Sequence, residues 1–242
     1  MKINSILWGN PKKSDYNLIL DYYSGTKINS IKTSSVPLAQ YWKKPEKALN
    51  ILSKYLNIPI ENPDIYFEYP TKSFDKNRSS MSDIMIISDR IKIAVEAKYT
   101  EYKKMKYQTI KDWKKEGDFN NREQVINHWM KMITPFCEIE SSFIDEIPYQ
   151  FFHRTASVCN GKPENSVVVY QLFWDNETLK YLASFISDLK TYIKLISPKP
   201  NLQYLIHTIE TFQEINCNKN EVFQLMKSKR IYRFGNEKLI LA

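Results

Sequence analysis

Glycine, cysteine and histidine are scarce in this sequence of 242 residues, and each scarcity argues against a class of protein. None of the five glycines belongs to a Gly-x-Gly-x-x-Gly pattern, a phosphate loop ending in Gly-Lys-Ser/Thr, or a Gly-x-Ser-x-Gly elbow. Nucleotide-dependent enzymes built on such loops and serine hydrolases are therefore disfavoured. The three cysteines (Cys137, Cys159 and Cys217) are widely spaced, which favours reduced thiols over a disulfide framework. With three histidines and no Cys-x-x-Cys pair, a structural zinc site is not expected.

Long hydrophobic runs are also missing. No apolar stretch approaches the roughly 20 residues of a membrane-spanning helix, and residues 1–9 lack a basic region followed by an apolar segment. We therefore expect no membrane association and a cytoplasmic location. Hydrophobic residues make up 43% and charged residues 26%, as in ordinary globular proteins. We find no repeat or linker, so one domain over residues 1–242 is the economical interpretation.

Positive charge is in excess, with a formal net charge of +8. Such an excess suits a polyanionic partner, because lysine and arginine that neutralise phosphates release condensed counterions. The charge alone is weak evidence, so its value depends on agreement with a specific site.

The most informative segment is residues 82–98, in which β-branched residues flank a polar Ser-Asp-Arg centre, a pattern typical of a β-hairpin. If residues 89–90 form a two-residue loop, Asp83 lies directly opposite Glu96, and Lys98 follows on the same face. Opposed Cβ atoms are roughly 4.5–5.5 Å apart, so two carboxylates there repel unless a cation lies between them. The pattern predicts a shared divalent cation. The opposite face, with Ile84, Ile86, Ile93 and Val95, is predicted to cover a core.

Two alternatives to this hairpin site remain open. Asp-Arg is not a preferred pair for a tight hairpin turn, and a three-residue loop or a bulge would rotate Asp83 away from Glu96. The charges would otherwise form a solvent-exposed face on which Lys98 pairs with Glu96.

The remaining elements follow from periodicity and breakers. Residues 1–44 are interpreted as irregular, with a short helix near 16–23. The other expected elements are a helix over 45–56, a strand over 64–69 ended by Pro70, a basic loop over 72–82, a helix over 122–133, a buried strand over 167–174, amphipathic helices over 177–196 and 202–215, and a short strand within 229–242.

The order helix, strand, hairpin, helix, strand, together with Asp83 and Glu96-Ala97-Lys98, resembles the PD-(D/E)XK nuclease superfamily over about residues 45–175. Ser82 stands where the motif has its proline, whereas a literal Pro63-Asp64 lies upstream and is interpreted as opening the earlier strand. The resemblance implies a mixed α/β fold of the restriction-endonuclease type, with three layers and a mixed central sheet between helices. Residues 1–44 would be an N-terminal extension, and residues 176–242 would add C-terminal helices.

What the resemblance implies is hydrolysis of a phosphodiester with Mg²⁺ or Mn²⁺ held by Asp83, Glu96 and the Ala97 carbonyl. Lys98 would stabilise charge on the phosphate, because nearby carboxylates oppose the lowered pKa that a general base needs. Glu46 is a further candidate ligand, although an acid after Pro45 also suits a helix N-terminus without any catalytic role.

The same resemblance suggests that a glutamine on the helix after the hairpin, Gln124, contributes to catalysis. His128 stands one turn later, where some branches of the superfamily have a tyrosine. Glu68 could face the site or be a solvated residue, and His153-Arg154 is only suggestive.

The expected partner is DNA, most simply double-stranded, and cutting both strands would favour a homodimer. Cations on either side of the hairpin would contact the backbone. They are Lys72, Lys76, Arg78, Lys103, Lys104 and Lys106. Two rival functions remain: a nucleic-acid-binding protein that lacks catalysis, and a metal-independent scaffold whose hairpin charges have no chemical role.

Overall fold

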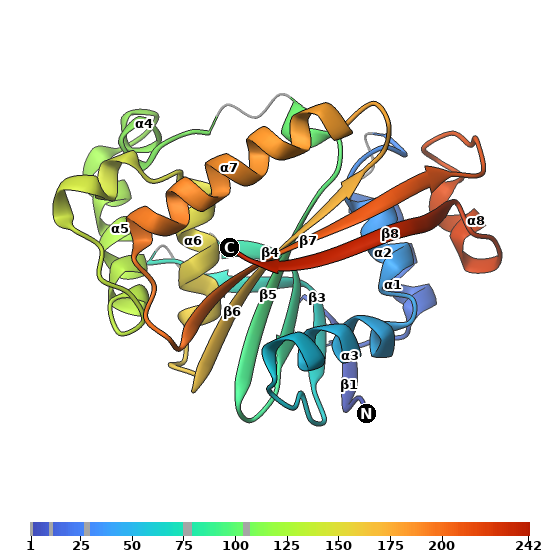
Figure 1. The fold of residues 1–242 in the computed structure, drawn as a ribbon, viewed down its shortest axis with the longest axis horizontal. Coiled ribbons are helices and arrows are strands. Elements are labelled where there is room, and N and C mark those ends of the chain that lie inside the picture. The colour runs from blue at the N-terminus through green and yellow to red at the C-terminus, as the bar shows by residue number, and fades with distance from the viewer. Residues whose placement is uncertain (1, 10–11, 27–29, 75–78, 104–106) are drawn as a thin grey trace.

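A single mixed β-sheet runs through the computed structural model, which describes residues 2–9, 12–26, 30–74, 79–103 and 107–242 (Figure 1). Within these residues eight strands pair in the order β2-β1-β3-β4-β5-β6-β7-β8. Parallel pairs join β1 to β3, β5 to β6 and β6 to β7, and the other neighbours are antiparallel. The strands are β1 (Ser5–Trp8), β2 (Lys12–Lys13), β3 (Asp64–Lys72), β4 (Ser79–Ile87), β5 (Ile91–Lys98), β6 (Asn165–Trp174), β7 (Leu202–Gln213) and β8 (Tyr232–Leu241).

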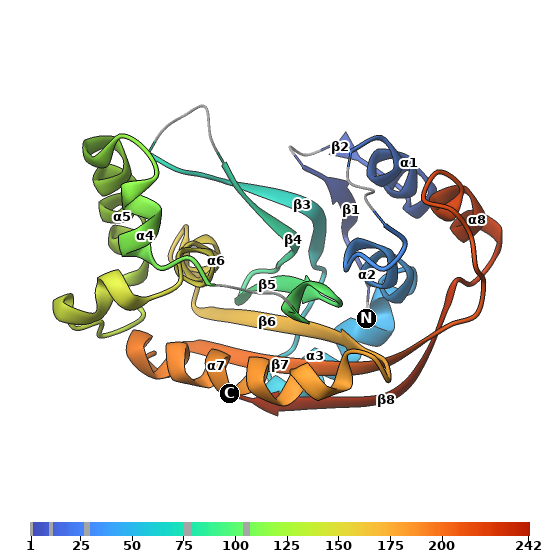
Figure 2. The same cartoon turned by 90° about the horizontal axis from the view of Figure 1, so that it is seen from above.

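Helices cover both faces of the sheet, which gives the three layers expected from the sequence (Figure 2). Two hydrophobic clusters lie between the layers. We call the face of the first cluster the α2 face; it carries α1 (Tyr16–Thr26), α2 (Ser35–Tyr41), α3 (Pro45–Leu56) and α8 (Val222–Ser228). We call the face of the second the α6 face; it carries α4 (Ile110–Lys115), α5 (Phe119–Ile133), α6 (Tyr149–Cys159) and α7 (Leu179–Ile196). Two 3-10 helices, η1 (Glu101–Lys103) and η2 (Ser141–Glu146), complete the described elements.

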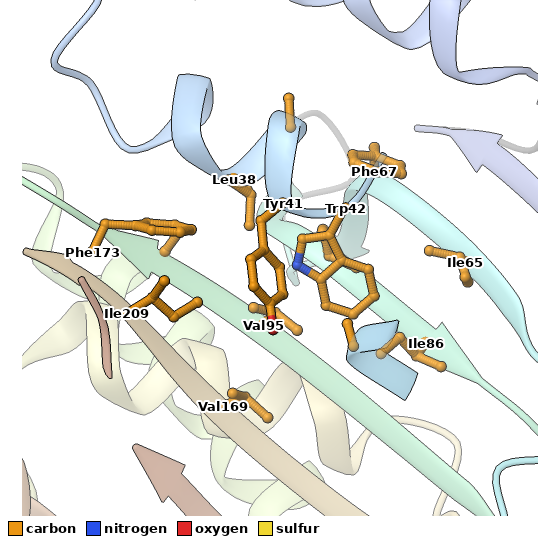
Figure 3. Packing of buried hydrophobic residues seen from close by; sticks show 14 of the residues in the cluster. Leu38, Tyr41, Trp42, Ile65, Phe67, Ile86, Val95, Val169, Phe173 and Ile209 are labelled. Carbon is orange, nitrogen blue, oxygen red and sulfur yellow. The ribbon is translucent and has the colours of Figure 1, made fainter. Parts of the chain in front are cut away.

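The α2 face shows why the apolar residues of the hairpin alternate. Ile86 and Val95 point from the sheet toward Trp42, which α2 places beside Tyr41, and Val169 and Phe173 of β6 continue the same surface (Figure 3). All of these side chains are buried. The expected core face of the hairpin is therefore confirmed.

The N-terminal 44 residues are not the irregular extension that we expected. They contribute α1, α2 and two strands, and β1 pairs in parallel with β3 from Ser5 opposite Asp64 to Trp8 opposite Phe67. A strand of four residues, of which only Leu7 is buried, carries little period-2 signal. Its pairing partner lies more than 50 residues away, so only the tertiary fold reveals it.

The helix expected over residues 202–215 is wrong, because this segment is β7, a strand of 12 residues. Tyr204, Leu205 and Ile206 are consecutive and buried, and they pack on both faces of the sheet. A central strand that is apolar on both sides reads as a continuous run, which period alone does not distinguish from a buried helix. The C-terminal part therefore contains two strands as well as α7 and α8. The last of them, β8, confirms the strand expected within residues 229–242.

The strand expected to end at Pro70 instead continues through it to Lys72, with Pro70 opposite Met81 of β4. Among the described residues β1 pairs with β3 only as far as Phe67, so within them the later part of β3 is an edge on that side. A proline lacking its N–H is tolerated on such an edge.

No helix in the described residues is long and apolar enough to cross a membrane.

Candidate active site

The hairpin of β4 and β5 has the two-residue loop on which the predicted site depends. The Ser88 N–H donates to the Ile91 carbonyl at 3.0 Å, which leaves Asp89 and Arg90 as the loop. Ile86 then lies opposite Ile93, and Ile84 opposite Val95. The alternative of a shifted register is thereby excluded.

The pairing between β4 and β5 ends at Ile84 and Val95, one residue before the acids. Beyond this point β4 stays paired with β3, where Ser82 lies opposite Tyr69. The Ala97 N–H, which a longer ladder would direct to Ser82, donates instead to Asp83 Oδ2 at 2.8 Å. The N–H and carbonyl of one strand residue point to the same side, so the Ala97 carbonyl also faces the opening between the strands. Asp83 thus lies where the two strands diverge.

A local distortion of β3 accompanies this divergence. Glu68 has a φ of 52°, in the left-handed region that costs a non-glycine residue free energy. It is buried, and it stands at the level of Asp83, between the pairs Phe67–Ile84 and Tyr69–Ser82. Residues two apart on a regular strand point to the same face of the sheet. Here Ile84 packs on the α2 face while Ser82 contacts α6, so the side-chain alternation of β4 is reversed at this level.

Glu96 is buried, accepts two hydrogen bonds and forms one further ion pair. Lys98 Nζ and Gln150 Nε2 lie 2.7 Å and 2.8 Å from Glu96 Oε1, and the Arg154 guanidinium forms an ion pair with Glu96 Oε2 at 2.6 Å. The Glu96 and Arg154 side chains are each 4% exposed, whereas that of Lys98 is 12% exposed. Asp83 is half-buried as Lys98 is, so these two are the more accessible members of the group, and Glu96 is its buried centre.

Helix α6 supplies the groups that hold the acids in position. Gln150 and Arg154 are four residues apart and so project from one face of the helix. Arg154 Nη1 also donates to Ser82 Oγ at 2.8 Å, and His153 Nδ1 lies 2.6 Å from Ser80 Oγ. One helix therefore connects β4 and β5 beyond the point at which they separate.

The two carboxylates have opposite pKa shifts. Burial raises the pKa of Asp83, and the charges of Glu96 and Glu68 raise it further against Lys98 and Arg154. Burial also acts to raise the pKa of Glu96, but Arg154 and Lys98 outweigh it and lower that pKa. Such a divided pair is a recurrent feature of functional sites.

The pKa values of the two basic groups, Lys98 and His153, also shift in opposite directions. Burial acts to lower the pKa of Lys98, but Glu96 and Asp83 outweigh it and raise that pKa, so Lys98 stays an ammonium ion. Burial, helped by Arg154, lowers the pKa of His153 to about 3, so His153 is neutral at physiological pH. Lys98 is thus suited to stabilise negative charge and unsuited to act as a general base.

Two residues expected at the site lie elsewhere. Gln124 is exposed on α5, and Glu46 is exposed in the first turn of α3, which packs on the α2 face. Of the cations expected to contact DNA, Lys72 is exposed at the end of β3, and Lys103 pairs with Glu177 at 3.3 Å. Lys76, Arg78, Lys104 and Lys106 lie outside the described residues.

Gln150 was not among the residues selected from the sequence, and Arg154 was noted there only as suggestive, although a signal for both exists. A glutamine and an arginine four residues apart lie on a largely buried helix of which Phe151, Phe152 and Ala156 are apolar members. A buried arginine requires a partner, and this spacing indicates that the partner lies on one side of the helix.

The glutamine that serves the site can be identified by a pair of substitutions. Gln150→Ala is expected to lower any metal-dependent cleavage by about 10–100-fold, the usual cost of losing a group that orients a metal ligand. Gln124→Ala, on the exposed side of α5, is expected to cleave at the wild-type rate. Initial cleavage rates of both variants measure this, and the reverse ranking would restore Gln124 as the functional residue.

The capacity for a metal rests on a small donor set. Among the described residues, no three His, Cys, Asp or Glu side chains come together closely enough to form a metal cluster. Mg²⁺ commonly takes one or two carboxylates and completes its shell with waters and substrate phosphates. Asp83, Glu96 and the Ala97 carbonyl fit this chemistry, provided that Glu96 exchanges one of its present donors.

The fold and the site together define a mixed α/β protein with an acid–lysine cluster where two central strands diverge. The chain belongs to the family described as Domain of unknown function (DUF6946), whose model matches residues 12–223. No curated protein and no solved structure gave a significant match.

Proposed function

We propose that this protein is a divalent-metal-dependent nuclease of the restriction-endonuclease type, which hydrolyses phosphodiester bonds in DNA. The observation that carries the proposal is the meeting of Asp83, Glu96 and Lys98 at the point where β4 leaves β5. The net charge of +8 suits a polyanionic substrate. A cytoplasmic location is part of the proposal, because all three cysteines are free.

Each residue has a distinct task in this proposal. Asp83, Glu96 and the Ala97 carbonyl would hold Mg²⁺, which when bound supplies an activated water and withdraws charge from the phosphate. Lys98, held in its charged form by its neighbours, faces the same opening and stabilises the negative charge that develops on the phosphate. Arg154 and Gln150 fix the Glu96 carboxylate, which makes them positioning residues.

The proposal is tested by plasmid cleavage with Mg²⁺, with Mn²⁺ and with EDTA, using wild-type protein and Glu96→Ala. Cutting that needs the metal and is lost in the variant is the expected result. Cutting in EDTA at the same rate would contradict the proposal, as would full activity of both Glu96→Ala and Asp83→Ala.

The chain offers a matched control for the lysine. Lys98→Gln is expected to lower the cleavage rate by about 10²–10³-fold, the usual cost of one preorganised charge-stabilising group. Lys92 lies six residues earlier on the same strand, is 7% exposed, and donates to the Asn160 carbonyl at 2.9 Å. Lys92→Gln removes a comparably buried charge outside the site and should leave cleavage unchanged. Equal losses in both variants would indicate a general effect on folding instead.

One observation favours a second candidate, a nucleic-acid-binding protein that lacks catalysis. Lys98 and Arg154 already balance the charge of Glu96, so the site is electrostatically satisfied without a metal. Calorimetric titration with Mg²⁺ separates the two functions. A nuclease should bind the ion and lose that binding in Asp83→Asn, whereas a silent protein should bind DNA in a salt-dependent manner and give no heat with Mg²⁺.

A further inference from the structure

A pocket lies on the α2 face, away from the candidate active site. Its volume is about 480 Å³, within the range of small-molecule sites. It opens where the junction of α2 and α3 meets the segment between α8 and β8. Tyr41, which lines it, belongs to the hydrophobic cluster of the α2 face, whereas Gln150 and Arg154 come from the helix that covers the α6 face.

All charged residues that line this pocket are cations: Lys43, Lys44, Lys47, Lys229 and Arg230. Two of them are neutralised, because Lys47 pairs with Glu237 at 2.9 Å and Arg230 with Glu214 at 2.9 Å. Within the described part of the chain, Lys44 and Lys229 form no ion pair. Lys43 likewise has no ion pair with a described residue; it lies over the Tyr16 ring, at 5.5 Å, and donates to the Met226 carbonyl at 3.5 Å. Three positive charges thus surround one cavity without an acid among its lining residues.

The Gln40 side chain joins the two walls of the pocket. The Gln40 carbonyl oxygen accepts from the N–H groups of Ile231 and Tyr232 at 2.7 Å and 2.9 Å, and its amide donates to the Tyr232 carbonyl. Gln40 therefore fixes the segment carrying Lys229 and Arg230 against α2. Packing of the fold therefore brings the backbone positions of these cations together.

A partly buried polar network holds Tyr41 and Lys47, two of the residues that line the pocket. Glu237 accepts from Tyr41 and pairs with Lys47, and it lies 2.7 Å from His207 Nε2. Gln171 extends the network, since its side chain contacts both His207 and the Trp42 indole N–H, the latter at 2.9 Å. Tyr41 and Trp42 lie side by side on the α2 face (Figure 3). A lining supported in this way preorganises a binding site.

The start of α3 adds to the positive potential. Helix α3 has 12 residues, begins with Pro45, and has no side chain hydrogen-bonded at its cap residue Lys44. The unpaired backbone N–H groups of a helix N-terminus attract anions. The lining residues Lys44 and Lys47 flank this first turn.

We propose that this pocket binds a small phosphate-bearing ligand of nucleotide size. The volume of the cavity suits such a ligand. The three lysines without an ion pair to a described residue and the N-terminus of α3 suit its phosphates. Tyr41 and Phe234 give the cavity an aromatic wall. The site is independent of the proposed nuclease chemistry, since it shares no residue with Asp83, Glu96 or Lys98.

The test uses the full-length protein and calorimetric titration at low salt with three probes: ATP, pyrophosphate and a 12-nucleotide single-stranded DNA. Saturable binding of ATP or pyrophosphate is expected. Lys44→Gln combined with Lys229→Gln should weaken it at least about tenfold, because charge-assisted hydrogen bonds to phosphate are among the strong ones. Both lysines are exposed, so the fold is not at risk.

A matched control removes the same charge elsewhere. Lys54 on α3 and Lys190 on α7 are also exposed and lie outside the pocket. Lys54→Gln combined with Lys190→Gln should bind ATP and pyrophosphate as the wild type does. Equal weakening in both double variants would overturn the proposal, as would binding of the oligonucleotide alone or no binding of any probe. Because plasmid cleavage is measured separately, failure here leaves the nuclease proposal untouched.

Discussion

Asp83→Asn is expected to abolish metal-dependent cleavage while leaving a protein at least as stable as the wild type. The asparagine keeps an oxygen that can accept from the Ala97 N–H, so the geometry of the opening is retained. It removes the negative charge that a metal ion requires, and the cleavage rate should fall at least about a hundredfold, as for loss of a preorganised electrostatic group. The cleavage assay and a thermal melt of the same preparation measure both effects.

The stability of this variant has a defined dependence on pH. Because burial and the neighbouring acids raise the pKa of Asp83, the folded protein retains the Asp83 proton to a higher pH than the unfolded chain does. As pH rises above the ordinary carboxyl pKa of about 4, the folded wild type binds more protons than the unfolded state and loses stability. Asp83→Asn lacks this loss.

The melting temperatures of the two proteins in EDTA should therefore diverge as pH rises from about 5 to about 8, with Asp83→Asn the more stable at the upper end. The lowered pKa of Glu96 acts with the opposite sign, but it is present in both proteins and largely cancels in the difference. A variant that melts below the wild type at high pH would show that Asp83 is a stabilising anion, against the electrostatics derived above.

Arg154→Met is expected to have the largest effect on stability. It removes the guanidinium from a pair in which both side chains are 4% exposed and leaves the Glu96 carboxylate buried with Lys98 and Gln150 only. Breaking one side of a buried ion pair costs about 3–5 kcal/mol. For a chain of this size that corresponds to a fall in melting temperature of about 6–20 °C. Chemical denaturation and thermal melts measure it.

The double variant Glu96→Gln with Arg154→Met separates the charge from the packing. When both partners lose their charge, the uncompensated carboxylate disappears, so the double variant should be more stable than Arg154→Met alone. The single variant Glu96→Gln completes the comparison. If the loss of stability in the double variant equals the sum of the losses in Glu96→Gln and Arg154→Met, the two residues do not interact, and Arg154 does not hold Glu96.

Much of the hairpin could be predicted from sequence because its determinants are local. Isoleucine and valine at alternate positions, together with two loop residues, fix the register from Ser88 opposite Ile91 to Ile84 opposite Val95. A register shift by one residue would turn this apolar set away from the core, which is strongly unfavourable. Because Asp83 and Glu96 directly follow the last pair, Ile84 and Val95, that register also places the two acids close together.

The sequence did not predict what happens one residue further along. Pairing stops at Ile84, Glu68 adopts a left-handed conformation, and Asp83 turns to the Ala97 N–H. These features depend on β3 and α6, which contact the hairpin from distant parts of the chain. For the same reason Gln150, and not Gln124, contacts Glu96, since the helix that reaches β5 is selected by packing across the sheet.

By itself the sequence determined the mixed α/β class, the hairpin with its core face, and the helices over residues 45–56 and 122–133, because local periodicity and turn residues encode them. Only the tertiary structure decided that residues 202–213 form a central strand, that the N-terminal segment completes the sheet, and which side chains surround Glu96. Burial on both faces and contacts between distant segments leave no periodic signal in the sequence, so they are specified only when the layers pack.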